Sequence, residues 1–279
     1  MTDWPDYELI DFGEGRKLER FGPVVFDRPC PTAVNAAKQN ASAWRNACSF
    51  AGDRAAEGKW TRTFKPFAVA AAGSELELAP LPSGQVGLFP EQFANWRWIT
   101  RQVERAKKPV RVLNLFAYTG GSTLAAAIAG AELTHVDAAK SMVTRARRNV
   151  DLSGLAEHPI RWIVEDATKF CQREVKRGNQ YDAVILDPPS YGHGPKGESW
   201  SIKRDLLPLL ELCGQLTADR RQFILCTCHT PGIGAAELSA YLSDGIFGHC
   251  GQPPQVGTLY LRTSDGRKLA SGEFARWPR

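Results

Sequence analysis

The chain has 279 residues, of which 43% are apolar and 23% charged, and its formal net charge is +5. This length and apolar content suffice for one large folded domain or two smaller ones, and the mild basic excess is compatible with an anionic partner. No run of about 18 apolar residues is present, which excludes a membrane-spanning helix. The acidic start, MTDWPDYELID, lacks the apolar region of a secretion signal, so we expect a cytoplasmic protein.

Residues 1–85 are predicted to form a small β-rich domain. In residues 7–31 and 59–89, apolar residues alternate with polar ones and Gly or Pro interrupts the pattern, which is typical of short strands joined by turns. Between them, residues 32–44 (TAVNAAKQNASAW) have a helical composition. We therefore expect one helix among several short strands.

Residues 86–279 are predicted to form a second domain, in which strands alternate with helices. This alternation indicates βαβ units and a mostly parallel sheet. Residues 256–277 predict a C-terminal hairpin with Asp265 and Gly266 at its turn. The predicted parallel strands are 110–117, 132–138, 160–167, 181–189 and 221–228, and the helices between them are 121–131, 140–154, 168–178 and 201–217.

Chemically distinctive residues follow the ends of these strands, where ligands of such sheets bind. The first loop, FAYTGG (116–121), places two glycines where backbone can approach a ligand closely, but lacks the G-x-G-x-x-G spacing of a pyrophosphate site. Asp137 can accept hydrogen bonds from both hydroxyls of a ribose, and Asp166 can accept one from an adenine amino group. Together they favour a nucleoside without phosphates, such as S-adenosylmethionine, although each acid alone is also typical of a helix N-cap.

The most specific stretch is DPPSYG (187–192), directly after a predicted buried strand. Its two prolines fix the backbone and remove two amide donors, which leaves carbonyl groups to accept hydrogen bonds from a base amino group. Tyr191 can stack on a flat base. The alternative interpretation is a rigid turn that only ends the strand.

The succession FAYTGG, VDA, EDA and DPPSYG resembles class I S-adenosylmethionine-dependent methyltransferases. Within them, it is most similar to the family that modifies bases of large-subunit ribosomal RNA, including cytosine C5. The resemblance covers residues 85–279, including GLFPEQFANWRWI (87–99), a segment that precedes the core in this family. Residues 1–85 resemble the family's small β-rich domain. Many members begin with an RNA-binding PUA domain, for which this chain has no room.

The resemblance implies an α/β fold with a Rossmann-like, mostly parallel sheet and an antiparallel C-terminal strand. It implies S-adenosylmethionine as the cofactor and RNA, in particular ribosomal RNA, as the partner. The residues expected to bind the cofactor are Phe116, Tyr118, Thr119, Gly120, Gly121, Asp137, Asp166 and Asp187. Those expected to take part in catalysis are Asp187, Pro188, Pro189, Tyr191 and Cys228.

The acceptor atom has two interpretations. If it is an exocyclic base nitrogen, Asp187 and a proline-loop carbonyl would hold its N–H groups. If it is cytosine C5, a thiolate must first add at C6. The strand 221–228 ends in Thr227-Cys228, which matches the Thr-Cys pattern of such enzymes and favours carbon, with Cys228 as the nucleophile. A cysteine there is equally typical of a small buried residue.

The cysteines are widely scattered and odd in number, so we expect thiols rather than disulfides. Cys226, Cys228 and His229 lie at adjoining positions of one strand and cannot surround a single ion, so we predict no metal site. The seven cysteines are Cys30, Cys48, Cys171, Cys213, Cys226, Cys228 and Cys250.

Three segments mix basic and aromatic residues, WRNACSF, KWTRTFK and NWRW. Arg and Trp together suit RNA backbone and base stacking, which predicts an RNA-binding face on the N-terminal domain, whereas buried tryptophans are the alternative.

Two other functions remain open: methylation of a protein side chain or small molecule, and RNA binding by a degenerate methyltransferase fold. Acids at three successive strand ends weigh against degeneration.

Overall fold

The protein is described by a computed structural model that covers residues 4–52, 58–249, 251 and 253–278. Cys250, predicted to be a thiol, lies outside the described residues. The chain divides into two compact units, one made of Met1–Phe93 and Tyr260–Ser271 and the other of Ala94–Leu259 and Gly272–Arg279. The predicted domain boundary after residue 85 stays a prediction. Within the described ranges, every helix is too short or too polar to cross a membrane.

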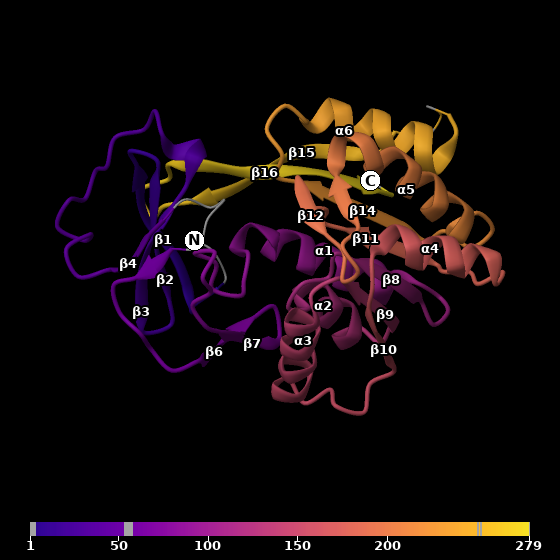
Figure 1. The fold of residues 1–279 in the computed structure, drawn as a ribbon, viewed down its shortest axis with the longest axis horizontal. Helices are drawn as coiled ribbons and strands as arrows, with labels where there is room; N and C mark the ends of the chain where they lie inside the picture. The colour runs from indigo at the N-terminus through magenta and orange to yellow at the C-terminus, as the bar shows by residue number, and fades with distance from the viewer. Residues whose placement is uncertain (1–3, 53–57, 250, 252, 279) are drawn as a thin grey trace. The chain divides into compact units, whose positions relative to one another are not determined.

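The first unit is rich in short strands, as predicted. Its larger sheet has the order β1-β2-β3-β4-β5, with β1 to β3 antiparallel and β3 parallel to β4. Figure 1 labels β1 to β4 of this sheet, in the indigo of the N-terminal residues. A separate two-stranded sheet pairs β6 with β7, whose inward side chains alternate with outward ones. The strands are β1 (Tyr7–Gly13), β2 (Arg16–Phe21), β3 (Val24–Pro29), β4 (Cys48–Ala51), β5 (Lys59–Trp60), β6 (Phe67–Ala71) and β7 (Ser74–Leu78).

The prediction of a helix over residues 32–44 is wrong. The segment contains only the 3₁₀ turn η1 (Pro31–Ala33) and further turns. The carboxylate of Asp11 accepts hydrogen bonds from the amides of Gln39 and Asn40, and the side chain of Asn40 accepts one from the amide of Ala43. These carboxylate and amide acceptors take backbone donors that a helix would need, which is how Asp and Asn disfavour helix interiors.

The second unit is built on a seven-stranded sheet of order β10-β9-β8-β11-β14-β16-β15, of which the end of β15, the start of β16 and the turn between them (260–271) belong to the first unit. The first five strands are parallel, and β16 runs antiparallel to β14. This confirms the predicted fold class. The strands are β8 (Arg111–Leu115), β9 (Glu132–Asp137), β10 (Ile160–Val164), β11 (Ala183–Leu186), β14 (Phe223–Cys228), β15 (Gln255–Arg262) and β16 (Lys268–Trp277), the last two joined by the predicted turn at Asp265 and Gly266.

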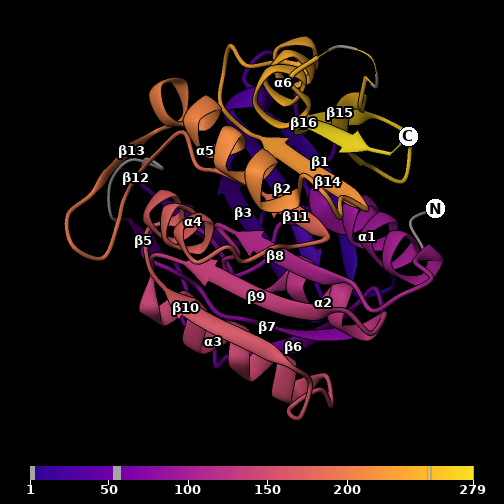
Figure 2. The same ribbon diagram turned by 90° about the vertical axis from the view of Figure 1, so that its right-hand side faces the viewer.

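Helices cover both faces of this sheet (Figure 2). Helices α1, α2 and α3 lie on one face, and α4, α5 and α6 on the other, where they share a core with β8, β11 and β14. Strand β11 is buried at every position, and its uninterrupted AVIL run is typical of a central parallel strand. The helices are α1 (Phe93–Arg105), preceded by η2 (Pro90–Gln92), α2 (Gly121–Ile128), α3 (Lys140–Leu152), α4 (Ala167–Lys176), α5 (Ile202–Thr217) and α6 (Ala235–Leu242), followed by η3 (Ser243–Phe247).

One small hairpin was not predicted. Strands β12 (Tyr191–His193) and β13 (Ser199–Ser201) pair antiparallel between the proline loop and α5. An ion pair between Lys169 on α4 and Glu198 links this hairpin to the helix, with 2.5 Å between nitrogen and oxygen. The hairpin is therefore held at the edge of the sheet where the parallel strands end.

Candidate active site

The parallel strands end at one edge of the sheet, and the residues predicted from the sequence follow there. The loop of Phe116–Gly121 follows β8, Asp137 ends β9, and Asp166 begins α4 after β10. Asp187 follows β11 and Cys228 ends β14. Strand register places the ends of β8, β9, β11 and β14 side by side, so these groups belong to one site.

The loop after β8 has an unusual backbone. Phe116 and Tyr118 adopt left-handed conformations, with φ of 53° and 50°, which bulky side chains rarely do. The surrounding structure fixes the loop, since the buried side-chain amide of Asn149 donates to the carbonyl of Thr119 at 2.8 Å. Strained residues of this kind cost about 1–3 kcal/mol each and gather at functional sites. The strained backbone is consistent with the predicted role of this loop in the site, although Glu14 and Ala72 in the first unit also have a positive φ.

The two glycines of the loop have a packing role on the protein side. A Cβ at Gly121 would lie 2.5 Å from the indole of Trp96, and one at Gly120 would lie 3.1 Å from the Cβ of Ala146 on α3. Gly120 also has a φ of 89°, which favours glycine. The missing side chains thus let α1 and α3 pack against the loop. Their predicted contact with the cofactor stays a prediction.

Asp137 is fixed by the backbone of that loop. Its Oδ2 accepts a hydrogen bond from the amide of Tyr118 and its Oδ1 one from the amide of Ala139, both at 2.8 Å. Burial raises the pKa of this carboxyl, and the two hydrogen bonds oppose the rise. Each carboxylate oxygen can accept a second hydrogen bond, so Asp137 presents a desolvated acceptor at the end of β9.

Asp166 acts as the N-cap of α4, the alternative that the sequence left open. Its Oδ1 accepts a hydrogen bond from the amide of Lys169 at 2.9 Å. The side chain is half-buried. A capping bond engages one oxygen of the carboxylate, so the cap and a ligand contact through the other oxygen are compatible.

The proline loop is joined to the end of β14 by side chains. The hydroxyl of Thr227 donates to Oδ1 of Asp187 at 2.6 Å, and Nε2 of His229 lies 3.4 Å from the same oxygen. The hydroxyls of Ser190 and Thr230 are 2.7 Å apart. These contacts fix Asp187 in a polar cluster at the sheet edge.

Trp200 connects the proline loop to the loop after β8. Its indole nitrogen donates to the carbonyl of Pro189 at 2.7 Å, and its ring packs against Phe116 with 4.9 Å between the ring centroids. The carbonyl of Pro189, expected to accept from a base, is thus already hydrogen-bonded within the protein. Tyr191, two residues after Pro189, has 75% of its surface exposed and is free to contact a large partner.

Cys228 lies in the core beneath α5 and α6. It is 1% exposed and shares its strand face with Cys226, which is 0% exposed. Its Sγ accepts a hydrogen bond from the amide of Thr230 at 3.4 Å. Burial raises the pKa of the Cys228 thiol above its ordinary value, although the bond from Thr230 opposes this. A raised pKa favours the thiol over the nucleophilic thiolate.

The other cysteines in the described residues are also free and buried. In the same described ranges, no group of three His, Cys, Asp or Glu side chains could hold a metal ion.

The site residues expected from the sequence did not include Trp200, Thr227 or His229. Thr227 and His229 flank the predicted Cys228 and could have been found from strand alternation, because side chains on either side of one residue share a face. Trp200 lies eleven residues beyond Pro189 on β13 and carries no local signal.

The aromatic residues of the three basic–aromatic segments lie mostly in the core. Trp96 and Trp98 on α1 are buried, Trp60 donates its indole N–H to the carbonyl of Leu81, and Trp44 donates to Asp11. Their basic neighbours, including Arg45, Lys59, Arg62 and Lys65, are exposed. On the predicted RNA-binding face of the N-terminal domain, exposed cations are therefore available to RNA, whereas most of the aromatic rings are not.

A model of the S-adenosylmethionine-dependent methyltransferase family matches residues 33–239, about three quarters of the chain. The chain belongs to this family. The methyltransferase also has a solved relative, a SAM-dependent methyltransferase from Agrobacterium tumefaciens, with 35% identity and a TM-score of 0.90 over 99% of this chain and 91% of that one. The protein SMU.776, solved in complex with SAH, shares the fold with a TM-score of 0.74 at 16% identity, over 99% of this chain and 76% of that one.

Curated relatives of the methyltransferase match a shorter region. Ribosomal RNA large subunit methyltransferase K/L of Aeromonas hydrophila is 32% identical over 128 residues, 45% of this chain and 17% of that protein. MJ1653 of Methanocaldococcus jannaschii, provisionally named a ribosomal RNA large subunit methyltransferase, is 34% identical over 147 residues, 53% of this chain and 37% of that protein. The match thus spans well under half the length of these relatives.

S-adenosylmethionine is the cofactor of this family, and the residues at the sheet edge fit it. Its ribose carries two hydroxyl donors, and Asp137 offers carboxylate acceptors that are held in place by two backbone amides. The cofactor has no phosphate, and the loop of Phe116–Gly121 is not a phosphate-binding glycine loop. These carboxylate acceptors thus suit the ribose of a nucleoside without phosphates.

Proposed function

We propose that this methyltransferase methylates a base of RNA, with large-subunit ribosomal RNA as the substrate class and the cytoplasm as its location. The observation that carries the proposal is the proline loop, in which a fixed carboxylate, Asp187, is followed four residues later by Tyr191, a tyrosine that is 75% exposed. An exposed ring beside an acceptor is what a splayed-out base requires. The names of the curated relatives support the RNA substrate.

In this proposal, the loop after β8 and the acids of the next strands bind the cofactor. Asp137 accepts hydrogen bonds from the ribose hydroxyls, and Asp166 accepts one from the adenine amino group. Phe116 and Tyr118 form the wall beside the methionine and adenosine moieties. The backbone of Thr119, Gly120 and Gly121 lies against the cofactor. Asp187 lies at the side of the cofactor site that faces the substrate. The strained backbone and the bonds between Asp137 and the loop support this assignment.

The proline loop holds the base. Bound S-adenosylmethionine supplies an electrophilic methyl group, so the protein's task is to place the acceptor atom in line with it. Tyr191 stacks on the base, Asp187 accepts an N–H of the base, and Pro188 and Pro189 keep the loop rigid. Thr227 and Trp200 act as positioning residues, because they bond to Asp187 and to the carbonyl of Pro189.

We propose a base nitrogen as the acceptor atom. Attack through Cys228 requires a thiolate that reaches the base, whereas this thiol is buried among apolar side chains and its pKa is raised. Asp187 is partly exposed at the sheet edge, with 29% of its side-chain surface accessible. The cysteine mechanism stays a prediction, and a substitution at Cys228 decides between the two.

The N-terminal part, residues 1–85, is proposed to contact RNA through its exposed cations. Of these, Arg45, Lys59, Arg62 and Lys65 carry the positive charge of the basic–aromatic segments. Such contacts to phosphate add affinity without reading sequence.

Methyl transfer from labelled S-adenosylmethionine tests the function. Large-subunit ribosomal RNA, free nucleosides and a protein extract are offered in separate reactions, and the labelled product is digested and analysed by mass spectrometry. We expect label in one nucleoside of the RNA. Label only in protein or in a small molecule, with unlabelled RNA, would overturn the RNA proposal and leave the family assignment intact.

A further inference from the structure

A pocket lies at the opposite edge of the sheet, where the parallel strands begin. It has a volume of about 690 Å³. We call it the amino-edge pocket; it is lined by Arg105, Ala106, Lys107, Lys108, Pro109, Val110, Asp182, Asp219, Arg220 and Gln222. Arg105 ends α1, and the other residues precede β8, β11 and β14. The pocket is therefore separate from the cofactor loop and the proline loop.

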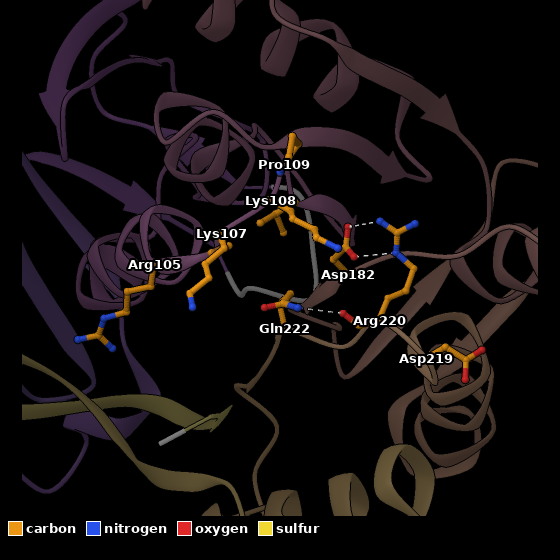
Figure 3. A pocket seen from close by; sticks show the side chains of 10 residues that line it. Arg105, Lys107, Lys108, Pro109, Asp182, Asp219, Arg220 and Gln222 are labelled. Carbon is orange, nitrogen blue, oxygen red and sulfur yellow. Dashed lines mark hydrogen bonds and ion pairs between the residues drawn. The ribbon is translucent and has the colours of Figure 1, made fainter.

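Its lining has more cations than carboxylates, four against two. Figure 3 shows Arg105, Lys107 and Lys108 in succession on one side of the pocket, with Asp182 and Arg220 beyond them. None of these three cations has a hydrogen bond or ion pair to another of the described residues. They are thus available to an anion from solution.

Asp182 does not cancel this charge. The carboxylate is 6% exposed and binds the guanidinium of Arg220 through two hydrogen bonds of 2.8 and 3.1 Å. It also accepts from the amide of Arg111 at 2.8 Å. The aspartate is committed to these donors and holds Arg220 in place at the pocket. Asp219 lies away from the lysines in Figure 3.

The concave surface continues on both sides along the same edge. A pocket of about 370 Å³ includes Arg111 and Arg161, and one of about 390 Å³ includes Arg220 and Arg221. Arg161 is paired with Glu174, and Arg221 donates to the carbonyls of Gly214 and Ile246, so both are engaged within the protein. The available cations are concentrated in the amino-edge pocket.

We propose that the amino-edge pocket binds phosphate groups of the RNA backbone, away from the nucleotide that is methylated. The inference rests on the proposed RNA substrate. Lysine and arginine side chains that face solvent bind such phosphates and release counterions. Parallel strands of four to six residues, at about 3.3 Å per residue, separate the two edges by roughly 13–20 Å. A folded RNA spans that distance, whereas a single nucleotide does not.

The test compares RNA affinity in two double variants of the full chain. Lys107→Glu/Lys108→Glu reverses the charge in the pocket, and Arg101→Glu/Lys176→Glu makes the same change in net charge at exposed positions that do not line it. The probes are a fluorescein-labelled stem-loop RNA and transcribed large-subunit ribosomal RNA, titrated at several salt concentrations. We expect the pocket variant to lose about 10-fold or more in affinity and its salt slope to fall by about two, since each phosphate contact contributes about one. The control variant should change less.

Lys107→Arg/Lys108→Arg, which keeps the charge, should retain wild-type affinity. Cofactor affinity measured by calorimetry should stay unchanged in every variant, because the lysines lie at the other edge of the sheet. If the glutamate variant misfolds, Lys107→Gln/Lys108→Gln serves in its place. Unchanged RNA affinity and salt slope in the pocket variant, or an equal loss in the control, overturns the pocket proposal even if the wild type methylates RNA. A wild type that methylates only protein or small molecules overturns the proposed function instead.

Discussion

The two halves of the carboxyl-terminal edge are built by different means. At β8 and β9, backbone groups define the site: Phe116 and Tyr118 have left-handed backbones, and the amides of Tyr118 and Ala139 hold Asp137. At β11 and β14, side chains hold the site: the Thr227 hydroxyl donates a hydrogen bond to Asp187, and the Trp200 indole donates one to the carbonyl of Pro189. In the proposed assignment, the first of these halves binds the cofactor and the second holds the base. Substitutions should therefore act differently on the two halves.

The largest effect is expected on the substrate side, from Asp187→Ala. This change removes the carboxylate that would accept the N–H of the base and that Thr227 now positions. Loss of a group that acts directly on the acceptor lowers the rate by about 10²-fold or more. Turnover of RNA is measured with labelled cofactor, and cofactor affinity by calorimetry. Asp187→Asn, which keeps the shape, should recover little turnover. If Asp187→Ala keeps wild-type turnover, the proline loop is only structural.

The next largest effect is expected on the cofactor side, from Asp137→Ala. Each charge-assisted hydrogen bond to a ribose hydroxyl contributes about 1.5–3 kcal/mol, so cofactor affinity should fall by about 10-fold or more. Calorimetry measures this affinity, and circular dichroism shows whether the variant is folded. Asp137→Asn, which can still accept one bond, should lie between the two. Unchanged affinity in a folded Asp137→Ala protein contradicts the ribose assignment.

The same carboxyl predicts a pH dependence. Burial raises the pKa of Asp137 above its ordinary value of 3.8, and only the ionised form offers acceptors on both oxygens. As the pH falls through this raised pKa, cofactor affinity should weaken, beginning at a higher pH than for an exposed aspartate. The Asp137→Asn variant should lack this acid-side loss.

The difference between the halves also explains what the sequence could predict. The residues of the backbone-defined half could be predicted from local signals. A strand, an aromatic pair, two glycines and an acid at the end of the next strand follow one another along the chain. The mostly parallel sheet and the hairpin at Asp265 followed equally from alternation and turn chemistry, whereas the order of the strands in the sheet was not predicted. Trp200 and the Ser190–Thr230 bond could not be predicted, since they join residues eleven and forty positions apart.

A smaller effect is expected from Trp200→Phe. The phenyl ring keeps the packing against Phe116 but cannot donate to the carbonyl of Pro189. A lost hydrogen bond costs about 0.5–1.5 kcal/mol, so kcat should fall by about 2–10-fold, with cofactor affinity unchanged. Trp98→Phe, a buried tryptophan on α1 that packs against Phe223, is the matched control. A lower melting temperature with no change in kcat would show that Trp200 has a structural role alone.

The smallest effect is expected from Cys228→Ala, and it tests the acceptor atom. Because the thiol lies in the core and burial raises its pKa, we expect methyl transfer to stay within about 2-fold of the wild type and the free energy of unfolding to fall by about 1 kcal/mol. Cys226→Ala, on the same strand face, should behave alike. RNA that carries 5-fluorocytosine should form no covalent adduct with the wild type. Complete loss of activity in Cys228→Ala alone, together with an adduct that requires Cys228, would instead make cytosine C5 the acceptor, and the loop after β14 would have to move to bring the thiol to the base.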